Sequence, residues 1–148
     1  MIKQAIIPLA GLGTRLLPLT SIFAKELLPI NGKPGIEYIL DECIEAGIKE
    51  VIFIISKKKE MIKKYFYNDS FYKKIIKKKK DKRILKEYKK ILKYKKMIKF
   101  VYQNKPMGTG DAVLKTRRFI KDNFFLKKRI FLYSLIILGS FFFFIIDL

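Results

Sequence analysis

A short glycine-rich segment, residues 10–15 with the sequence Ala-Gly-Leu-Gly-Thr-Arg, contains residue types suited to binding phosphate. Gly11 and Gly13 permit backbone conformations closed to other residues and let a ligand approach the main chain. Backbone N–H groups in such a turn can bind anionic oxygens. Thr14 adds a hydroxyl, and the guanidinium of Arg15 matches the geometry of phosphate oxygens. Taken alone, the segment also fits a structural turn that carries a surface arginine.

The spacing of these residues excludes two common nucleotide-binding motifs. The third glycine of a dinucleotide fingerprint would fall on Leu16, and a Walker A loop would need a Gly-Lys-Ser/Thr ending. A second loop, residues 103–110, again holds glycines that permit close approach, Gly108 and Gly110. The amide of Gln103 has both a donor and an acceptor, which suits the edge of a pyrimidine base. By itself Gln103 also fits a solvated loop.

The first of these loops must be positioned by the elements around it. The apolar run at residues 4–9 predicts a strand that ends near Pro8, because proline cannot donate to a sheet ladder. Residues 35–47 repeat apolar side chains at helical spacing and predict an amphipathic helix, with Cys43 on the apolar stripe as a packed core thiol. Residues 49–57 are almost continuously apolar and predict a strand covered on both faces.

The rest of the pattern predicts an α/β fold. A third strand is expected at 98–102, and helices at 59–66, at 71–97 (one or two) and at 111–120, with Asp111 at the helix start. Alternating strands and helices favour a Rossmann-like, doubly wound and mostly parallel sheet. Ligands bind at the carboxyl ends of the strands in such sheets, and both glycine-rich loops fall at that edge.

The segment after the first loop carries a resemblance to a known family. It contains Pro18, Thr20, the run Lys25-Glu26-Leu27-Leu28-Pro29 and the pair Lys33-Pro34. With the glycine-rich loop and the later Gln-Asn-Lys-Pro-Met-Gly-Thr-Gly-Asp-Ala-Val, it resembles the sugar-phosphate nucleotidyltransferases over roughly residues 1–123. Ala10, where other branches usually carry glycine, and Glu26 after Lys25 resemble the branch that uses UTP. Thymidylyl or adenylyl transfer remains an alternative.

The resemblance implies a reaction and a set of residues. UMP would pass from UTP to glucose 1-phosphate, giving UDP-glucose and pyrophosphate, with Mg²⁺ as the family's cofactor. The uracil and the ribose would lie against the backbone at the start of the first loop, and the rest of that loop would hold the triphosphate. The implied catalytic residues are Arg15 and Lys25. The implied nucleotide-binding residues are Ala10, Gly11, Gly13, Thr14, Gln103 and Gly108.

The resemblance weakens after residue 123. The family has an aspartate there that holds Mg²⁺, whereas this sequence has no acidic residue between Asp122 and Asp147. Asp111 and Asp122 are poor substitutes, so no metal ligand is predicted. We expect residues 1–123 to be the nucleotide-binding half of an incomplete fold. Residues 124–148 are then an apolar tail foreign to it, with truncation or a frameshift leaving little or no activity.

The net charge of +20 is concentrated in one segment. Residues 57–99, expected as a lysine-rich helical insertion, hold 19 Lys and one Arg against four acids. Arg is the better sign of specific nucleic-acid contact, so nucleic acid is not a favoured partner. A non-catalytic basic module that binds RNA or a membrane surface stays as the alternative function. Residues 130–146 are 17 uncharged residues, which just reaches the lower limit for a membrane span, and an anchor there is not favoured.

Several classes of protein are excluded or disfavoured by composition. A single cysteine rules out an intramolecular disulfide framework, and no histidine is present for catalysis or metal binding. The first residues lack the pattern of a secretory signal. These features favour a cytoplasmic protein, and a homo-oligomer stays open.

Overall fold

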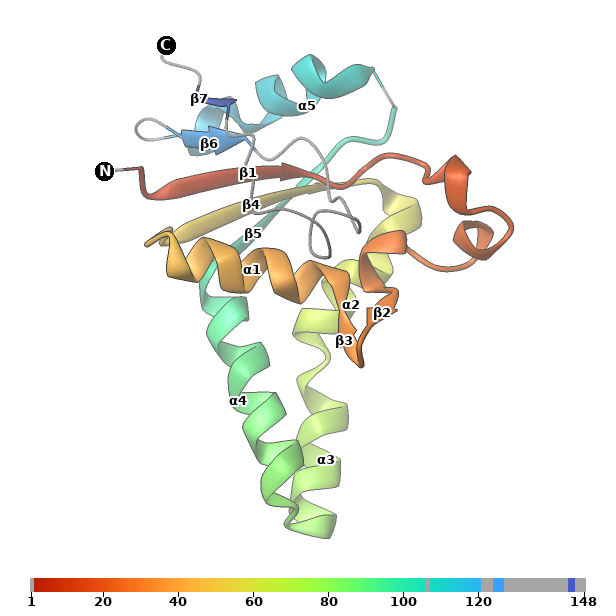
Figure 1. Cartoon of the computed structure of the whole chain (residues 1–148), viewed down its shortest axis with the longest axis vertical. Helices are drawn as coiled ribbons and strands as arrows, with labels where there is room; N and C mark the ends of the chain where they lie inside the picture. Colours follow the sequence, from red (N-terminus) through yellow and green to blue (C-terminus); the bar gives the residue numbers. More distant parts are fainter. Residues whose placement is uncertain (1, 106, 121–123, 127–143, 146–148) are drawn as a thin grey trace.

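The computed structural model describes residues 2–105, 107–120, 124–126 and 144–145 and shows a mixed α/β arrangement (Figure 1). A five-stranded sheet has the order β5-β4-β1-β6-β7. Strands β1, β4, β5 and β6 run parallel, and β7 runs antiparallel to β6. Their bounds are Gln4–Pro8 for β1, Glu50–Ile55 for β4, Ile98–Tyr102 for β5, Phe124–Leu126 for β6 and Phe144–Ile145 for β7. The predicted, mostly parallel α/β sheet is confirmed.

Helices cover both faces of this sheet, with α1 (Gly35–Glu45) and α5 (Gly108–Thr116) on opposite sides (Figure 1). Successive side chains of a strand point to opposite faces. Ile7 of β1 therefore packs in the core under α1, whereas Ile6 packs in a smaller core with Ala112 of α5. Burial on both faces explains why β1 and β4 read as continuous apolar runs.

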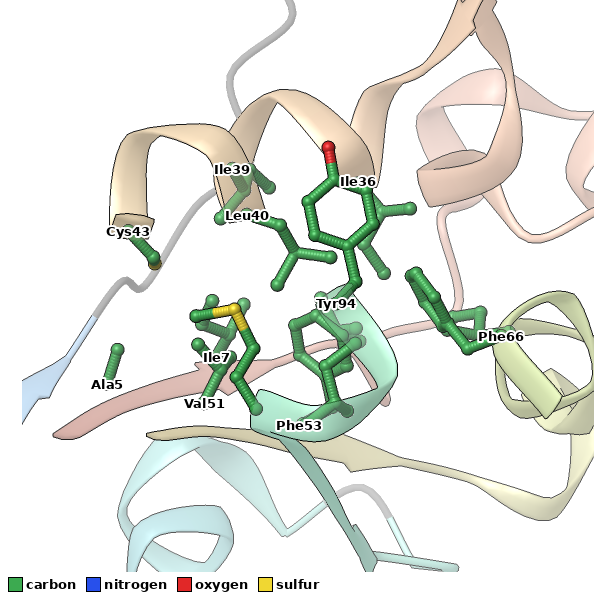
Figure 2. Close-up of a cluster of buried hydrophobic side chains, with 14 of the residues drawn as sticks. Ala5, Ile7, Ile36, Ile39, Leu40, Cys43, Val51, Phe53, Phe66 and Tyr94 are labelled. Carbon is green, nitrogen blue, oxygen red and sulfur yellow. The ribbon is translucent and has the colours of Figure 1, made fainter. Parts of the chain in front are cut away.

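The larger core lies between α1 and the sheet (Figure 2). Cys43 is only 5% exposed there, which confirms the predicted core thiol. The side chain of Tyr94 reaches the same core from a later helix and packs edge-to-face on Phe66. Other members from α1 and the sheet are Ile36, Ile39, Leu40, Ala5, Ile7, Val51 and Phe53.

The lysine-rich segment folds into helices. After α2 (Glu60–Tyr67), the helices α3 (Asp69–Lys79) and α4 (Lys82–Met97) form a hairpin that extends away from the sheet (Figure 1). Asp81 caps α4 by accepting hydrogen bonds from two backbone N–H groups at the helix start. The prediction of one or two helices is thus resolved as two. We call residues 69–97 the lysine hairpin.

Short elements between β1 and α1 were not predicted. Strands β2 (Pro29–Ile30) and β3 (Lys33–Pro34) form a small antiparallel hairpin whose turn residues, Asn31 and Gly32, both have positive φ. Three short 3₁₀ helices lie in this stretch: η1 (Thr14–Leu16), η2 (Leu19–Ser21) and η3 (Lys25–Leu27). Two more are found later in the described part of the chain, η4 (Lys57–Lys59) and η5 (Arg117–Phe119).

One boundary differs from expectation at the second glycine-rich loop. The predicted helix at 111–120 begins three residues earlier, at Gly108, and gives way to η5 after Thr116. The glycines of the predicted loop 103–110 thus lie in the first turn of α5, where Gly108 has a positive φ.

Two predictions concern the end of the chain. The first three residues of the predicted tail 124–148 form β6 and pair in parallel with Gln4–Ile6 of β1. The predicted anchor at 130–146 lies outside the described residues apart from 144–145 of β7. Among the residues that the structure describes, none of the helices is both long and apolar enough to cross a membrane.

Candidate functional site

Both glycine-rich segments leave the sheet at the same edge, the carboxyl ends of β1 and β5. The backbone N–H of Leu9 donates to Ile54 O at 2.7 Å, and the N–H of Gln103 donates to Ile55 O at 2.8 Å. Both segments are therefore tied to the end of β4, which lies between them. Because neighbouring strands lie about 4.8 Å apart, the two segments start about 10 Å apart. The structure thus brings Ala10 and Gln103 to one edge.

The first loop has a backbone that only glycine adopts easily. Gly13 has a φ of 73° and directly precedes η1. Its carbonyl oxygen accepts a hydrogen bond of 2.8 Å from the hydroxyl of Thr20. A Cβ added at Gly13 would lie 3.2 Å from the methyl group of Thr20 and 3.6 Å from Cδ of Lys25. The side chain of Lys25 therefore lies against the loop at Gly13.

The cations and the hydroxyl of the loop are accessible to a ligand. Thr14 and Arg15 are exposed on η1, and Lys25 is partly exposed. Ala10 is 8% exposed, while Gly11 is exposed and an added Cβ there would meet open space. The loop therefore offers an exposed guanidinium, an ammonium and a hydroxyl around an open backbone.

The side chain of Gln103 is buried and oriented by the start of α5. Its Nε2 donates to Gly108 O at 3.0 Å and to a carboxylate oxygen of Asp111 at 2.7 Å. These two acceptors fix the amide, so its carbonyl oxygen Oε1 is the group that can accept from a ligand. The sequence suggested that both ends of the amide would face a base, whereas the structure engages the donor end within the chain.

The first turn of α5 lies next to Gln103, at the carboxyl end of β5. Gly108 is exposed with a φ of 88°, and a Cβ there would have no atom within 4 Å. Asp111 lies in the first turn, as predicted, and forms an ion pair of 3.2 Å with Lys115. The hydrogen bond from Gln103 and that from Lys115 hold the pKa of Asp111 below its ordinary value of 3.8. Asp111 is therefore a charged acceptor that orients Gln103.

The structure reveals a buried ion pair beside Lys25 that sequence reasoning missed. Lys59 donates to both carboxylate oxygens of Glu26, at 2.7 and 2.9 Å. The side chains of Lys59 and Glu26 are 9% and 1% exposed. Nothing in the sequence pattern pairs Glu26 of η3 with a lysine 33 residues later, since the contact depends on the fold.

The acidic side chains at this edge do not form a metal site. The carboxylate of Glu26 is bound by Lys59, and that of Asp111 accepts from Gln103 and pairs with Lys115. Within the described part of the chain, no group of three or more acidic, cysteine or histidine side chains is close enough to hold a metal ion. The described residues therefore do not fit the magnesium ion that the family resemblance implies.

The sequence of the chain is similar to those of known proteins. A family model described as nucleotidyl transferase matches residues 4–140. A UTP–glucose-1-phosphate uridylyltransferase of Bacillus subtilis is 40% identical over 121 residues, which are 82% of this chain and 41% of the relative. A putative enzyme of the same name from Methanocaldococcus jannaschii is 35% identical over 126 residues, 85% of this chain and 44% of the relative.

The fold of the chain is also similar to those of solved protein structures. A UDP-glucose pyrophosphorylase from Acinetobacter baumannii superposes with a TM-score of 0.72 at 32% identity, covering 86% of this chain and 45% of that one. A UTP-bound UGPase from the same organism gives a TM-score of 0.70 at 31% identity, with the same coverage. The chain thus spans under half the length of the proteins it matches.

Proposed function

The chain belongs to the nucleotidyl transferase family, which confirms the resemblance seen in its motifs, and we propose that it binds UTP for transfer of UMP to glucose 1-phosphate. The curated relatives carry the name of this uridylyltransferase, and one structural neighbour is described as UTP-bound. Since the chain spans under half of these proteins, the activity, the substrates and the partners of a whole enzyme are part of the proposal.

One observation carries the proposal: the phosphate-type loop and the buried amide meet at one edge of the sheet. Lys25 lies against Gly13, and Gln103 lies across the end of β4 with its donor end held by Asp111. A separation of about 10 Å between the starts of the two loops suits a nucleotide that reaches from one to the other. Base and phosphate binding would then be divided between the two loops.

Uracil recognition follows from the orientation of the amide. The N3–H of uracil is a donor, whereas N3 of cytosine is an acceptor. The carbonyl oxygen of Gln103 would accept from the uracil N3–H, and cytosine at the same place would set two acceptors against each other. The positive φ of Gly108 and the open space beside it would let the base approach the start of α5.

The phosphates would lie at the first loop. Arg15 and Thr14 on η1 and the ammonium of Lys25 would bind their oxygens and offset the charge that grows as a phosphate oxygen of the sugar attacks the α-phosphorus. The new P–O bond forms as the bond to the β-phosphate breaks, and pyrophosphate leaves with that electron pair. This in-line step needs alignment and no protein nucleophile.

Magnesium and cellular location remain expectations. Mg²⁺ is the cofactor implied by the family, and no step is assigned to it because the described residues do not fit a site for it. UTP is made and used in the cytoplasm, so we infer that the protein works there. Dependence of UTP binding on Mg²⁺ can be measured by titrating UTP with and without a chelator.

Calorimetric titration of the 148-residue chain with UTP tests the proposal. We expect saturable binding to the wild type and a loss of about tenfold or more in affinity for Arg15→Ala, since charge-assisted hydrogen bonds contribute about 1.5–3 kcal/mol. Arg117→Ala is the matched control. Arg117 is an exposed arginine on η5, near the opposite edge of the sheet, where Gln4 at the start of β1 donates to Phe119 O.

Competition separates the proposal from its alternatives. Tighter binding of dTTP or ATP than UTP would assign a related transferase. Binding to RNA or anionic vesicles that falls steeply with salt and ignores Arg15→Ala, without any UTP binding, would assign a basic binding module instead.

A further inference from the structure

The residues on both sides of Lys25 are held by residues that follow β4. On one side, Glu26 accepts two hydrogen bonds from Lys59, the last residue of η4. On the other side, the backbone N–H of Ala24 donates to Sδ of Met61 at 3.1 Å. Ala24 is 4% exposed and Glu26 is 1% exposed, so both neighbours of Lys25 are buried. Lys25 is thus the partly exposed residue between two fixed neighbours.

Burying the Glu26–Lys59 pair costs free energy that an apolar contact of similar size would not cost. Removing two charges from water is expensive, and apolar residues of similar volume often stabilise a protein as well or better. The core around the pair is already apolar, with Ala24 and Ile62 both buried in the larger cluster. A bidentate contact to a carboxylate fixes direction as well as distance, which an apolar contact does not.

Lys59 also lies close enough to Lys25 for the two charges to interact. Burial lowers the pKa of Lys59, the carboxylate of Glu26 opposes that change, and the positive charge of Lys25 lowers it further. Repulsion between the two ammonium groups favours an arrangement with the Lys25 side chain turned away from the buried pair. The contact between Lys25 and Gly13 lies on the loop, consistent with that direction.

We propose that Lys59 is a positioning residue for the nucleotide site: through its double hydrogen bond to Glu26 it fixes η3 so that Lys25 meets the triphosphate at Gly13. The proposal rests on the proposed UTP-binding function. Lys59 itself touches no ligand, because its ammonium is buried and bonded to Glu26. Its effect on binding passes entirely through Lys25.

A double variant separates positioning from stability. Lys59→Met or Glu26→Met alone leaves one charge buried without its partner and should lower the thermal midpoint clearly. The double variant Glu26→Met/Lys59→Met removes both charges and should recover most of that loss. We expect its UTP affinity to stay about tenfold below that of the wild type even where the thermal midpoint has recovered.

A second cycle tests whether the effect passes through Lys25. Lys25→Ala alone should cost about tenfold in UTP affinity, and adding it to the double variant should cost under about twofold more, since the two changes remove one interaction. The matched control is Asp69→Asn/Lys95→Met, which removes a 2.6 Å ion pair inside the lysine hairpin. It should leave the UTP affinity unchanged.

The outcomes separate the positioning role of Lys59 from the UTP-binding function on which it rests. A folded double variant with wild-type UTP affinity, or losses that simply multiply with Lys25→Ala, would overturn the positioning role and leave UTP binding intact. Absence of UTP binding in the wild type would overturn the proposed function and, with it, the role of Lys59.

Discussion

The loop edge and the lysine hairpin are both basic, yet they use positive charge in opposite ways. Residues 10–28 contain two cations, Arg15 and Lys25, which both follow the glycine turn in the sequence. The lysine hairpin contains fourteen basic residues against three acidic ones. Most of its cations are exposed along two helices that extend from the sheet (Figure 1).

This difference shows that a high density of positive charge does not by itself define a phosphate-binding site. At the loop edge, the backbone of Gly13, the hydroxyl of Thr20 and the buried Glu26–Lys59 pair set the positions of the cations. Exposed lysines of the hairpin have no comparable framework, and each keeps much of its rotamer freedom, which a ligand would have to restrict. Specific phosphate binding is therefore expected at the edge that carries less charge.

The largest expected effect compares two cations from each region. Arg15→Ala/Lys25→Ala should lower the affinity for UTP about 100-fold or more, because each residue would contribute a charge-assisted contact. Lys77→Ala/Lys78→Ala, which removes the same charge from the tip of the hairpin, should change it less than about twofold at 0.15 M salt, beyond a Debye length of about 8 Å. Calorimetric titration measures both, and equal losses would remove the distinction between the regions.

A smaller effect concerns the glycine turn. Gly13→Ala should cost about 2 kcal/mol of unfolding free energy, from a left-handed backbone and from the 3.2 Å contact with Thr20, whose hydroxyl is held by Gly13 O. Gly47→Ala, with a φ of 77° and open space around it, should cost about 1 kcal/mol from the backbone alone. Urea denaturation of both variants gives the difference, and equal costs would show that Thr20 moves aside freely.

The sequence predicted the sheet because its strands are buried on both faces. Strands β1 and β4 read as almost continuous apolar runs, and the apolar stripe of α1 has a clear helical period. The hairpin β2–β3 was missed although Asn31-Gly32 is the strongest short signal for a two-residue turn. Strands of two residues leave no period to read, so only the turn could have indicated it.

The sequence indicated candidate residues for the site but not the contacts that those residues make. Glycine spacing and the run around Lys25 pointed to a phosphate loop, and the structure places Lys25 against Gly13. The partners of Gln103 and Glu26 were beyond sequence reasoning. One depends on α5 starting at Gly108, and the other on where η4 lies relative to η3.

A pH dependence tests how the hairpin is attached to the sheet side of the molecule. Asp41 on α1 accepts a hydrogen bond from Tyr94 of α4 and forms ion pairs with Lys33 and, at 3.8 Å, with Lys90. Burial raises the pKa of Asp41, but the hydrogen bonds from Lys33 and Tyr94 and the charges of Lys33 and Lys90 outweigh it. The pKa therefore lies below its ordinary 3.8.

A lowered pKa means that ionised Asp41 stabilises the fold above pH 3.8 and loses this contribution as the pH falls through its folded value. We expect Asp41→Asn to cost about 1 kcal/mol at pH 7, with the difference from the wild type shrinking below pH 3.8. Urea midpoints at pH 7, 5 and 3 measure it. A difference that stayed constant with pH would show that the charge of Asp41 does not hold α4.

The smallest expected effect lies at the tip of the hairpin. Replacing Lys77–Lys80 with glutamine should change the unfolding free energy by less than about 0.5 kcal/mol, because these side chains are exposed. Lys90→Gln is the comparison, since Lys90 binds buried Glu37 at 2.8 Å and should cost more. Chemical denaturation compares the unfolding free energies of the two variants. A larger loss for the tip variant than for Lys90→Gln would mean that the lysines at the tip stabilise the fold.

The position of β1 between β4 and β6 has a consequence for biosynthesis. Gln4 pairs with Glu50 on one side and with Phe124 on the other, 46 and 120 residues further along the chain. At translation rates of about 5–20 residues per second, the first strand to emerge waits about 6–24 s before its second partner is made. Pairings this distant in sequence also form slowly. One side of β1 is therefore an open strand edge on the nascent chain, and this makes β1 the place where a ribosome-bound chaperone would protect the protein most.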